Sequence, residues 1–387
     1  MSGWSAEQRA LQESTREFVR REVEPHLQEW EDECEIPRSL HLAAAKAGLL
    51  GVAFPVEVGG QGGSLLDSVA MQEAFFEAGG SSGLAAGLFT GGIALPHVAA
   101  HGTPEQIELF VRPTLAGERI GSLAVTEPGG GSDVADIRTT AVRDPSTGSG
   151  QAREYVVNGA KTFITSGVRA DFVTTAVRTG AAGHAGLSLL VIEKGTPGFT
   201  VDRALAKMGW HCSDTAEMSF VDVRVPAANL VGAENAGFYL IAEQFVVERI
   251  ALAVHAYGIA SRSLALAAAY CRERTTFGEP LIARQVVQHK LVEMHRQVET
   301  ARTYTREIAA RHVDGDNVIA EACLAKQTAV EACAHVVDEA VQLHGGTGYM
   351  HGTEVERHYR DARILGIGGG ATEVLTDLSA RLLGYTP

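Results

Sequence analysis

The chain has 387 residues, of which 45% are hydrophobic, 21% charged and 6% aromatic, and its formal net charge is -14. This length allows two or three domains with a substantial buried core, and the composition excludes a largely disordered chain. The net negative charge argues against duplex DNA or an anionic membrane as a partner, because both attract basic surfaces. An anionic ligand would therefore need a local basic pocket.

The cysteines carry no pairing signal. There are five, with no C-x-x-C pair and no histidine at zinc-ligand spacing: Cys34, Cys212, Cys271, Cys323 and Cys333. We interpret them as reduced, structural residues in a reducing compartment and expect no metal site. The opening segment MSGWSAEQRA lacks a basic start followed by an apolar run, so no signal peptide is evident. We expect a cytoplasmic protein.

The first part of the chain has a helical pattern. Apolar residues recur at helical spacing from Ser5 to about Glu118, with breaks at Pro37, Gly59-Gly60 and Gly79-Gly80. This pattern predicts an N-terminal helical domain over residues 1–118.

The middle of the chain changes to short β-branched runs. They lie between Ile120 and about Leu230 and include residues 155–157, 172–175 and 189–192. Asn158-Gly159 is typical of a hairpin turn, and Asp144 to Gly150 has the composition of a polar loop. We expect a compact antiparallel β domain over residues 119–230.

Long helical patterns return after Asn235-Ala236-Gly237. Four are predicted, and they run from Phe238 to about Arg274, from Val286 to Arg311, from Val318 to Leu343, and onward from about Thr372. They predict an up-and-down helical bundle over residues 231–387. The first is apolar enough to raise the question of a membrane span. Because it contains Glu243, Glu248 and Arg249, we favour a helix buried in protein.

A glycine-rich segment separates two predicted strands. Residues 124–133 read AVTEPGGGSD, and these glycines let the backbone lie against a flat or phosphorylated ligand. Thr126, Ser132 and free N–H groups could then bind the polar edge of that ligand. A plain turn between strands is the alternative, and this segment alone leaves both open.

The order of the three parts and four motifs resembles the acyl-CoA dehydrogenase family. The motifs are AVTEPGGGSD, NGAKTFITSG at 158–167, YCRERTTFGEPLIARQ at 270–285, and QLHGGTGYM at 342–350 followed by RDARILGIGGGATEV at 360–374. The resemblance implies an α+β fold with a central β domain between helical parts. It also implies FAD as cofactor and oxidation of an acyl-CoA to the trans-2-enoyl-CoA, as in fatty-acid β-oxidation.

The resemblance also implies which residues contact FAD. They are Leu123, Val125, Thr126, Gly131 and Ser132 in the first motif, Phe163, Ile164 and Thr165 in the second, and Arg274, Thr276, Phe277, Gln285, Gln342, Gly345, Gly346, Ala371 and Glu373 in the bundle. Thr126 would reach the N5/O4 edge of the flavin, and Phe163 stands where the family often has a tryptophan packed on it. Arg274 and Phe277 would bind the FAD of an adjacent protomer. A homotetramer, and at least a dimer, is therefore implied.

The reaction needs a base close to the substrate Cα. Many family members carry it as Tyr-Glu-Gly-Thr, but the aligned residues here are Gly368 to Ala371. A branch that includes isovaleryl-CoA and long-chain acyl-CoA dehydrogenases places the glutamate in a Glu-Arg pair on the preceding helix, where Glu248-Arg249 stand. The resemblance thus implies Glu248 as base and the Gly369 N–H as donor to the thioester oxygen. Ser132, Arg249 and Gly370 would contact the acyl-CoA.

Glu248 also fits this role on local physical grounds. On a helix its neighbours at three and four residues are Gln244, Phe245, Ala251 and Leu252, a face without an opposite charge. Burial would raise the pKa of its carboxyl toward neutrality, as a general base requires, whereas a solvated or capped carboxylate is the alternative. The glycines at 368–370 would free volume for a bulky or branched chain. Combining Glu248→Gly with Gly369→Glu should then recover turnover.

Two groups of basic residues admit other interpretations. The histidines at 335, 344, 351 and 358 recur at intervals near seven, but we favour solvated or core positions over a metal site. Arg357, Arg360 and Arg363 could bind CoA phosphates or form ion pairs with Glu356 and Asp361, and both remain open.

The expected function is acyl-CoA oxidation with electrons passed to an electron-transferring flavoprotein. One alternative is a flavin oxidase or oxygen-using relative on the same fold. Another is a non-catalytic acyl-CoA-binding member of the family. The acyl chain, and whether it is carried by CoA or by a protein-bound pantetheine, stay open.

Overall fold

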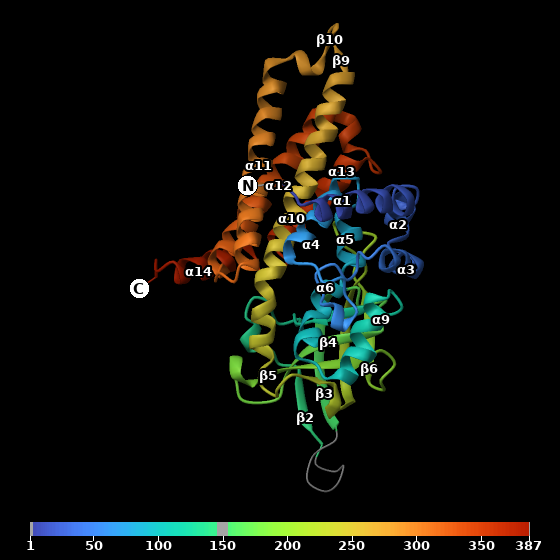
Figure 1. Ribbon diagram of the computed structural model, residues 1–387, viewed down its shortest axis with the longest axis vertical. Coiled ribbons are helices and arrows are strands. Elements are labelled where there is room, and N and C mark those ends of the chain that lie inside the picture. The colour runs from blue at the N-terminus through green and yellow to red at the C-terminus, as the bar shows by residue number, and fades with distance from the viewer. Residues whose placement is uncertain (1–2, 145–153, 387) are drawn as a thin grey trace.

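The computed structural model describes residues 3–144 and 154–386. A β domain lies at one end of the molecule, a helical bundle extends from it, and the N-terminal helices pack against both (Figure 1). This arrangement confirms the predicted α+β class. Apart from Asp144, the expected polar loop lies outside the described residues.

Short helices build the N-terminal part. They are α1 (Ala6–Phe18), α2 (Leu27–Glu33), α3 (Arg38–Lys46), α4 (Leu65–Glu77), α5 (Ser82–Leu88), α6 (Gly91–Ala94), α7 (Pro96–His101), α8 (Pro104–Gln106) and α9 (Arg112–Leu115). Ser5 caps α1 in a reciprocal capping box with Gln8, and Ser64 does the same for α4 with Asp67. The predicted breaks fall between helices: α3 follows Pro37, and α4 ends just before Gly79. These caps and breaks account for the short helices.

The middle part is one sheet. Its strands are β1 (Gly121–Ala124), β2 (Thr140–Arg143), β3 (Glu154–Thr165), β4 (Phe172–Arg178), β5 (Leu187–Glu193), β6 (Phe199–Ala204), β7 (Thr215–Pro226) and β8 (Leu230–Val231). The strand order is β6-β7-β3-β2-β4-β5-β8, with β1 paired to β4. The three predicted β-branched runs lie in β3, β4 and β5. The expectation of a purely antiparallel sheet was wrong, because β1 and β2 both pair with β4 in parallel.

The predicted hairpin turn at Asn158-Gly159 was also wrong. Both residues lie inside β3, where Asn158 pairs with Thr140 of β2. Gly159 has φ +152°, and a Cβ there would stand 2.5 Å from Thr139 Oγ1. The register between β3 and β7 shifts at this point, as at a β-bulge. The glycine therefore permits a close approach within the sheet rather than a turn.

The sheet is apolar on both faces. Phe172, Leu189 and Val191 pack with residues of the N-terminal helices and the first turns of α10. Their neighbours in sequence point the other way, so Val173 and Leu190 pack against residues of β3 and β7. This period-two alternation gives the β domain a core of its own and attaches it to the helices.

The C-terminal part contains four long or medium helices and a shorter one. They are α10 (Gly237–Glu273), α11 (Gln285–Val313), α12 (Ile319–His344), α13 (Glu354–Ala362) and α14 (Thr372–Leu382), and a small β9–β10 hairpin (Thr275–Thr276, Glu279–Pro280) joins α10 to α11. The four predicted helices are present. The sequence did not predict α13, since its buried side chains include the polar Arg357, His358 and Asp361 in place of an apolar stripe.

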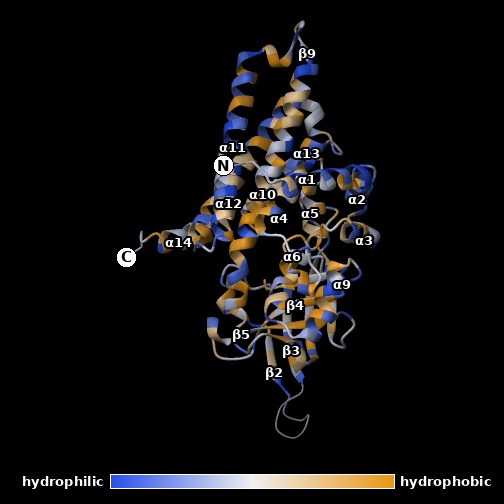
Figure 2. Ribbon diagram, viewed as in Figure 1, coloured by the Kyte–Doolittle hydropathy of each residue, from blue (hydrophilic) through white to orange (hydrophobic). Residues whose placement is uncertain are grey.

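Helix α10 connects the two ends of the molecule. Its 37 residues span roughly 55 Å at 1.5 Å per residue, from the sheet to the β9–β10 hairpin (Figure 1). It is the one described helix with the length and hydropathy of a membrane span, or one of two if the bent pair Ser82–Leu88 and Gly91–His101 is counted. Of its most apolar window, 61% is buried inside the protein. Figure 2 shows that much of α10 is apolar, and many of its residues are buried, as expected for a core helix.

Candidate active site

Glu248 lies about a third of the way along α10, opposite the glycine turn before α14. Its side chain is partly accessible, and desolvation by the surrounding protein raises the pKa of its carboxyl above the ordinary value. Within the described residues the carboxylate accepts no hydrogen bond. A Cβ built on Gly369 would stand 3.3 Å from Glu248 Oε1. The sequence-predicted base and the sequence-predicted N–H donor are therefore brought together from positions 121 residues apart.

Two cations act on this carboxylate. Lys326 of α12 and Arg249 both hold the pKa of Glu248 below the value that burial alone would give. The expectation of a face without opposite charge holds along α10 but is wrong in three dimensions, because Lys326 comes from a neighbouring helix. With Glu248 protonated, both cations remain to stabilise negative charge on a bound ligand.

Arg249 does not form an ion pair with Glu248. It is 7% exposed, its guanidinium lies over the Phe245 ring at 5.2 Å from the centroid, and its Nε is buried without a partner. Burying a cation without a hydrogen-bonding partner is costly. The unpartnered Nε leaves Arg249 able to donate to a group that the protein itself does not supply.

The turn at 368–370 is shaped by its glycines. Gly369 has φ +63° and Gly370 φ +97°, a left-handed conformation that other residues adopt at a cost of about 1–2 kcal/mol. A Cβ on Gly369 would lie 2.2 Å from Leu252 Cδ1, and one on Gly370 would lie 2.8 Å from Leu375 Cδ2. Leucine side chains thus fill the positions where the sequence predicts free volume for the acyl chain. That expectation about freed volume was wrong at these two positions.

The glycine-rich segment after β1 forms a tight turn. Glu127 and Gly130 bond each other's backbone, and the chain then folds back so that a Cβ on Gly131 would lie 3.0 Å from Thr126 Cγ2. Thr126 is half-buried, whereas Gly131 and Ser132 are exposed. The segment is therefore a turn, and it can still bind a ligand, because Thr126 lies beside an exposed backbone loop.

A buried ion pair holds this segment against β3. Lys161 is fully buried and donates to Val125 O and to Glu127 Oε1, each at 2.9 Å. Glu127 also accepts from the N–H groups of Arg138 and Thr139 at 2.8 Å. Sequence reasoning missed Glu127 and Lys161, although each lies inside a motif. Lys161 is the one charged residue of NGAKTFITSG, and this was the signal that could have found it.

The second motif presents an aromatic side chain to solvent. Phe163 has φ +60° and is 68% exposed, at the register shift of β3 against β7. Such strain in a bulky residue persists at functional sites. Ile164, by contrast, is buried in the sheet core.

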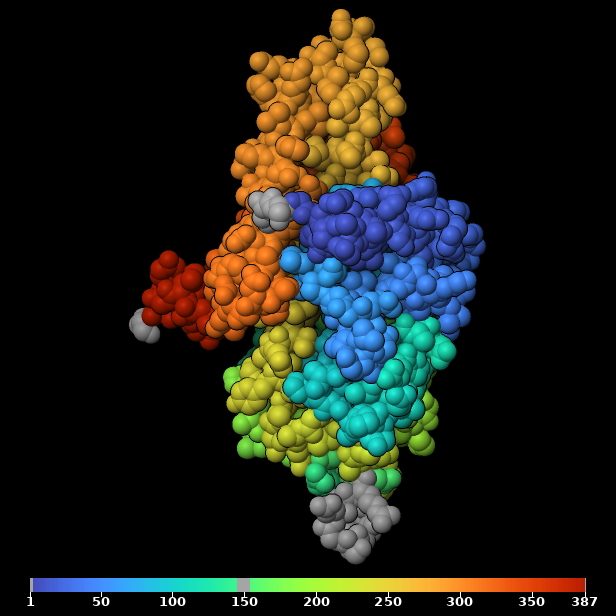
Figure 3. All heavy atoms as spheres, viewed as in Figure 1, coloured from blue at the N-terminus to red at the C-terminus, as the bar shows by residue number. Residues whose placement is uncertain are grey.

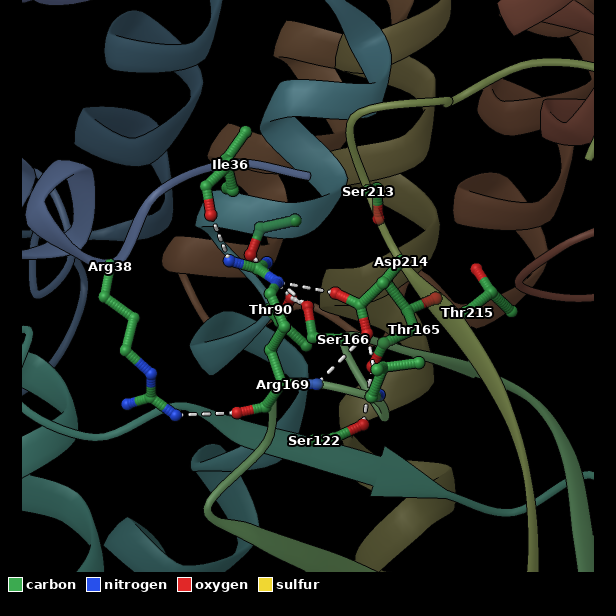
Figure 4. Close-up of polar contacts among 12 residues, drawn as sticks. Ile36, Arg38, Thr90, Ser122, Thr165, Ser166, Arg169, Ser213, Asp214 and Thr215 are labelled. Carbon is green, nitrogen blue, oxygen red and sulfur yellow. Dashed lines mark hydrogen bonds and ion pairs between the residues drawn. The ribbon is translucent and has the colours of Figure 1, made fainter. Parts of the chain in front are cut away.

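Thr165 ends β3 and is anchored to three other segments (Figure 4). Ser122 of β1 donates to its carbonyl at 2.6 Å, and Ser166 shares a 2.6 Å hydrogen bond with Thr90. The adjoining Arg169 forms a buried ion pair with Asp214 at 2.7 Å. These contacts fix the end of the strand on which Phe163 and Thr165 stand.

The remaining predicted FAD residues lie in three segments. Ala371 and Glu373 begin α14, next to the glycine turn. The β9–β10 hairpin, which projects from the end of the molecule far from the β domain, is surrounded by Arg274, Thr276, Phe277 and Gln285 (Figure 3). Gln342 lies in the last turn of α12, and Gly345 and Gly346 lie in the 3-10 helix that follows it. Phe277 has φ +53° and is 98% exposed. One FAD cannot contact both the hairpin and Thr126 of the same chain.

The described residues fit a bound flavin. Phe163 offers an exposed aromatic face, Gly131 leaves room for the backbone beside Thr126, and a Cβ on Gly345 or Gly346 would meet no atom within 4 Å. The exposed Arg274 adds a cation suited to phosphate oxygens.

The histidines and arginines that admitted other interpretations lie in separate environments. His344 stacks on Tyr270, buried His358 bonds Ser263 Oγ at 2.8 Å, and His351 lies near surface carboxylates. Among residues 3–144 and 154–386, no group of three His, Cys, Asp or Glu residues could hold a metal ion. Arg360 forms an ion pair with Glu356, which favours the ion-pair interpretation for that residue.

Three family models match the chain in order. They describe the acyl-CoA dehydrogenase N-terminal domain over residues 5–118, its middle domain over 122–223 and its C-terminal domain over 235–384. The chain belongs to the acyl-CoA dehydrogenase family. It is accordingly an FAD-dependent oxidoreductase that dehydrogenates acyl-CoA thioesters between Cα and Cβ.

Individual relatives cover nearly the whole chain. The mitochondrial long-chain specific acyl-CoA dehydrogenase of Rattus norvegicus is 37% identical over 98% of this chain and 86% of its own length. A solved structure described as a "probable acyl CoA dehydrogenase" from Mycobacterium abscessus is 61% identical, with a TM-score of 0.95 over 98% of this chain and 99% of that chain. A chain in a structure described as the electron transferring flavoprotein of Acidaminococcus fermentans is 31% identical, with a TM-score of 0.93 over 99% of both chains.

Proposed function

We propose that Glu248 is the base that removes the Cα proton of the acyl-CoA and that the Gly369 N–H binds the thioester oxygen. One observation carries this proposal: the Glu248 carboxylate lies beside Gly369, 3.3 Å from the Cβ position of that residue. The carboxylate thus stands where the side chain of residue 369 would begin, so a base on α10 can serve the same substrate as a base on the turn.

Glu248 and Gly369 act in the same step: Glu248 on the proton that leaves Cα, and Gly369 on the negative charge that develops. Glu248 accepts the Cα proton and becomes neutral, while negative charge moves to the thioester oxygen. The N–H of Gly369 has no acceptor within the described residues and is available to that oxygen. Bound FAD supplies the acceptor for the hydride that leaves Cβ.

The environment of Glu248 suits a base that works near neutral pH. Phe245 and Leu252, one turn before and one turn after it on α10, are partly buried in the neighbouring cores. Desolvation raises the pKa of Glu248, and the charges of Lys326 and Arg249 limit the rise. Ser132, Arg249 and Gly370 would contact the CoA thioester in this arrangement.

We propose an electron-transferring flavoprotein as the acceptor and a homotetramer as the assembly. The similarity to a chain from a structure described as an electron transferring flavoprotein supports the first. The second is supported by the fully exposed Phe277 on a projecting hairpin and by α14, which extends from the body of the molecule (Figure 3). Each FAD would then contact Thr126 and Thr165 of one protomer and Arg274 of its partner.

We propose a cytoplasmic location and a role in β-oxidation. The five cysteines are free and four of them are buried, which suits a reducing compartment.

Anaerobic mixing with a panel of straight and branched acyl-CoAs tests the proposed function. Bleaching of the flavin absorbance by at least one of them is expected, and no bleaching by any would indicate a non-catalytic acyl-CoA-binding protein. Reoxidation of the bleached enzyme should be faster with an electron-transferring flavoprotein than with O₂. Faster reoxidation by O₂ would favour the oxidase alternative.

A further inference from the structure

Lys326 is a buried lysine without a carboxylate partner in ion-pair contact. It is 2% exposed, and in the described parts of the chain no carboxylate lies within 4.0 Å of its Nζ. Desolvation lowers its pKa to about 8. A buried ammonium is costly unless its hydrogen bonds are satisfied. The groups that accept hydrogen bonds from the Lys326 ammonium therefore indicate the role of this lysine.

Those acceptors are two carbonyls of the glycine turn. Nζ donates to Gly368 O and, at 2.7 Å, to Gly370 O. The two carbonyls flank Gly369, which has φ +63°. Three successive glycines have more backbone freedom than any other tripeptide, so the turn needs external contacts to hold one conformation. Lys326 supplies two of them.

The direction of the Gly369 N–H follows from peptide geometry. The described peptide bonds are all trans, so the C=O of residue 368 and the N–H of residue 369 point in opposite directions. Because Gly368 O points at Lys326, the Gly369 N–H points away from it. This N–H has no acceptor among residues 3–144 and 154–386.

The Lys326 charge also acts on the proposed base. Its interaction with Glu248 favours the carboxylate form, and the other charged or titratable groups that face Lys326 are Arg249 and Cys323. When a proton moves from the substrate Cα to Glu248, the negative charge moves to the thioester oxygen. The Lys326 cation behind the turn can stabilise the negative charge both on the Glu248 carboxylate before the transfer and on the thioester oxygen after it.

We propose that Lys326 is a positioning residue of the active site: it holds the glycine turn so that the Gly369 N–H is aimed at the thioester oxygen of the bound acyl-CoA. The proposal rests on the proposed function. Lys326 touches neither substrate nor cofactor in it, and acts through the peptide between Gly368 and Gly369.

The test separates α-deprotonation from hydride transfer. The probe is the 3-thia analogue of whichever acyl-CoA reduces the wild-type flavin fastest. Sulfur replaces its Cβ, so it can lose the Cα proton but has no Cβ hydride to give. Its bound enolate is read from the long-wavelength charge-transfer absorption beside oxidised FAD, and analogue affinity is measured in the same titration.

The variants are Lys326→Met and Lys326→Gln, with Lys290→Met as the matched control. Lys290 of α11 pairs with Glu339 at 2.6 Å and does not contact the turn. In Lys326→Met we expect analogue affinity within about threefold of wild type and at least a tenfold smaller charge-transfer absorption. Lys326→Gln, which keeps an N–H donor group but loses the charge, should lie between them. Lys290→Met should match wild type.

Two results would overturn the proposal. One is a charge-transfer absorption in Lys326→Met at half the wild-type level or more. The other is loss of bound FAD in both Lys326 variants, because that would make Lys326 a residue of the fold alone. Absence of the absorption in the wild type would instead contradict the proposed function, so the two failures are distinguishable.

Discussion

The carboxylate of Glu248 and the backbone of Gly369 meet across the gap between α10 and the turn before α14, with Oε1 3.3 Å from the Cβ position of residue 369. A base on the helix and a base on the turn would therefore reach the same point from two directions. The side chain that decides between them is Leu252, which lies one helical turn beyond Glu248.

Moving the base to the turn should require a smaller residue at 252. Leu252 Cδ1 lies 2.2 Å from the Cβ position of Gly369, and φ +63° adds backbone strain for any side chain there. The double variant Glu248→Gly with Gly369→Glu should therefore stay inactive, contrary to the expectation from the sequence. Adding Leu252→Ala should restore measurable flavin reduction.

Leu252→Ala alone is the control for that series. It should keep the wild-type rate within about tenfold, because Glu248 remains in place. Equal recovery in the double and triple variants would show that Leu252 does not exclude a glutamate from position 369.

The rate of flavin reduction at saturating substrate should depend on pH on both sides. Desolvation raises the pKa of Glu248, and the base must be deprotonated, so the rate rises as pH increases through that pKa. The pKa of Lys326 is lowered to about 8, so its charge, and with it part of the rate, is lost as pH increases through 8. Stopped-flow bleaching between pH 5 and 10 measures both limbs. If the flavin-reduction rate of Lys326→Met still decreased at alkaline pH, the decrease could not be assigned to Lys326.

Breaking the buried Lys161–Glu127 pair should weaken both the fold and FAD binding. Lys161→Met leaves the Glu127 carboxylate buried without its cation, a change that typically costs about 3–5 kcal/mol. Thermal unfolding and flavin content after gel filtration measure the effect. Lys194→Met is the control, since the Lys194 side chain is exposed and donates to a backbone carbonyl, Val168 O, rather than to a carboxylate. Adding Glu127→Gln to Lys161→Met should restore part of the loss, and a further loss instead would argue against the pair.

Buried histidines should make the protein sensitive to mild acid. Burial lowers the pKa of His41 to about 3 and of His97, His255 and His358 to about 4. Between pH 4 and 6.5 the imidazoles of these histidines are protonated in the unfolded chain but remain neutral in the folded protein. As pH decreases through this range, the free energy of unfolding therefore decreases by up to about 1.4 kcal/mol per pH unit for each histidine. Asp361, with its pKa raised to about 7, works in the opposite direction.

His97→Leu tests this account of acid sensitivity. Both ring nitrogens of His97 are buried without partners among the described residues, so leucine should be tolerated and should reduce the pH dependence by up to one proton. Denaturant unfolding at pH 5.0 and 7.0 measures the slope. His289→Leu, at an exposed position on α11, should keep the wild-type slope. An unchanged slope in His97→Leu would contradict the role of that residue.

The sequence predicted features that depend on local pattern. The β-branched runs at 172–175 and 189–192 form β4 and β5, and Pro37 separates two helices as expected. Asn158-Gly159 failed because that glycine is required by the close approach of Thr139, in the segment just before β2, and no local pattern records this approach. Helix α13 was missed because its buried positions include the polar His358 and Asp361, which bond Ser263 and the Trp210 N–H only in the folded chain.

Some residues of the candidate site could likewise be predicted from local pattern, and others could not. Glu248 and Gly369 could be named from their motifs, because the missing turn glutamate pointed to a carboxylate elsewhere. Lys326 could not, since its acceptors are backbone carbonyls more than forty residues away and carry no side-chain signal. Leu252 was visible as a neighbour of Glu248, but its contact with the turn exists only in three dimensions.

The most direct test of the account is single-turnover flavin reduction by Glu248→Gln under anaerobic conditions, with the acyl-CoA that reduces the wild type fastest. Glutamine keeps the shape of the side chain but cannot accept the Cα proton. The account predicts unchanged FAD content, substrate affinity within a few-fold of wild type, and a bleaching rate reduced by roughly 10²- to 10⁴-fold. Bleaching at a rate close to wild type would show that another group removes the proton and would contradict the account.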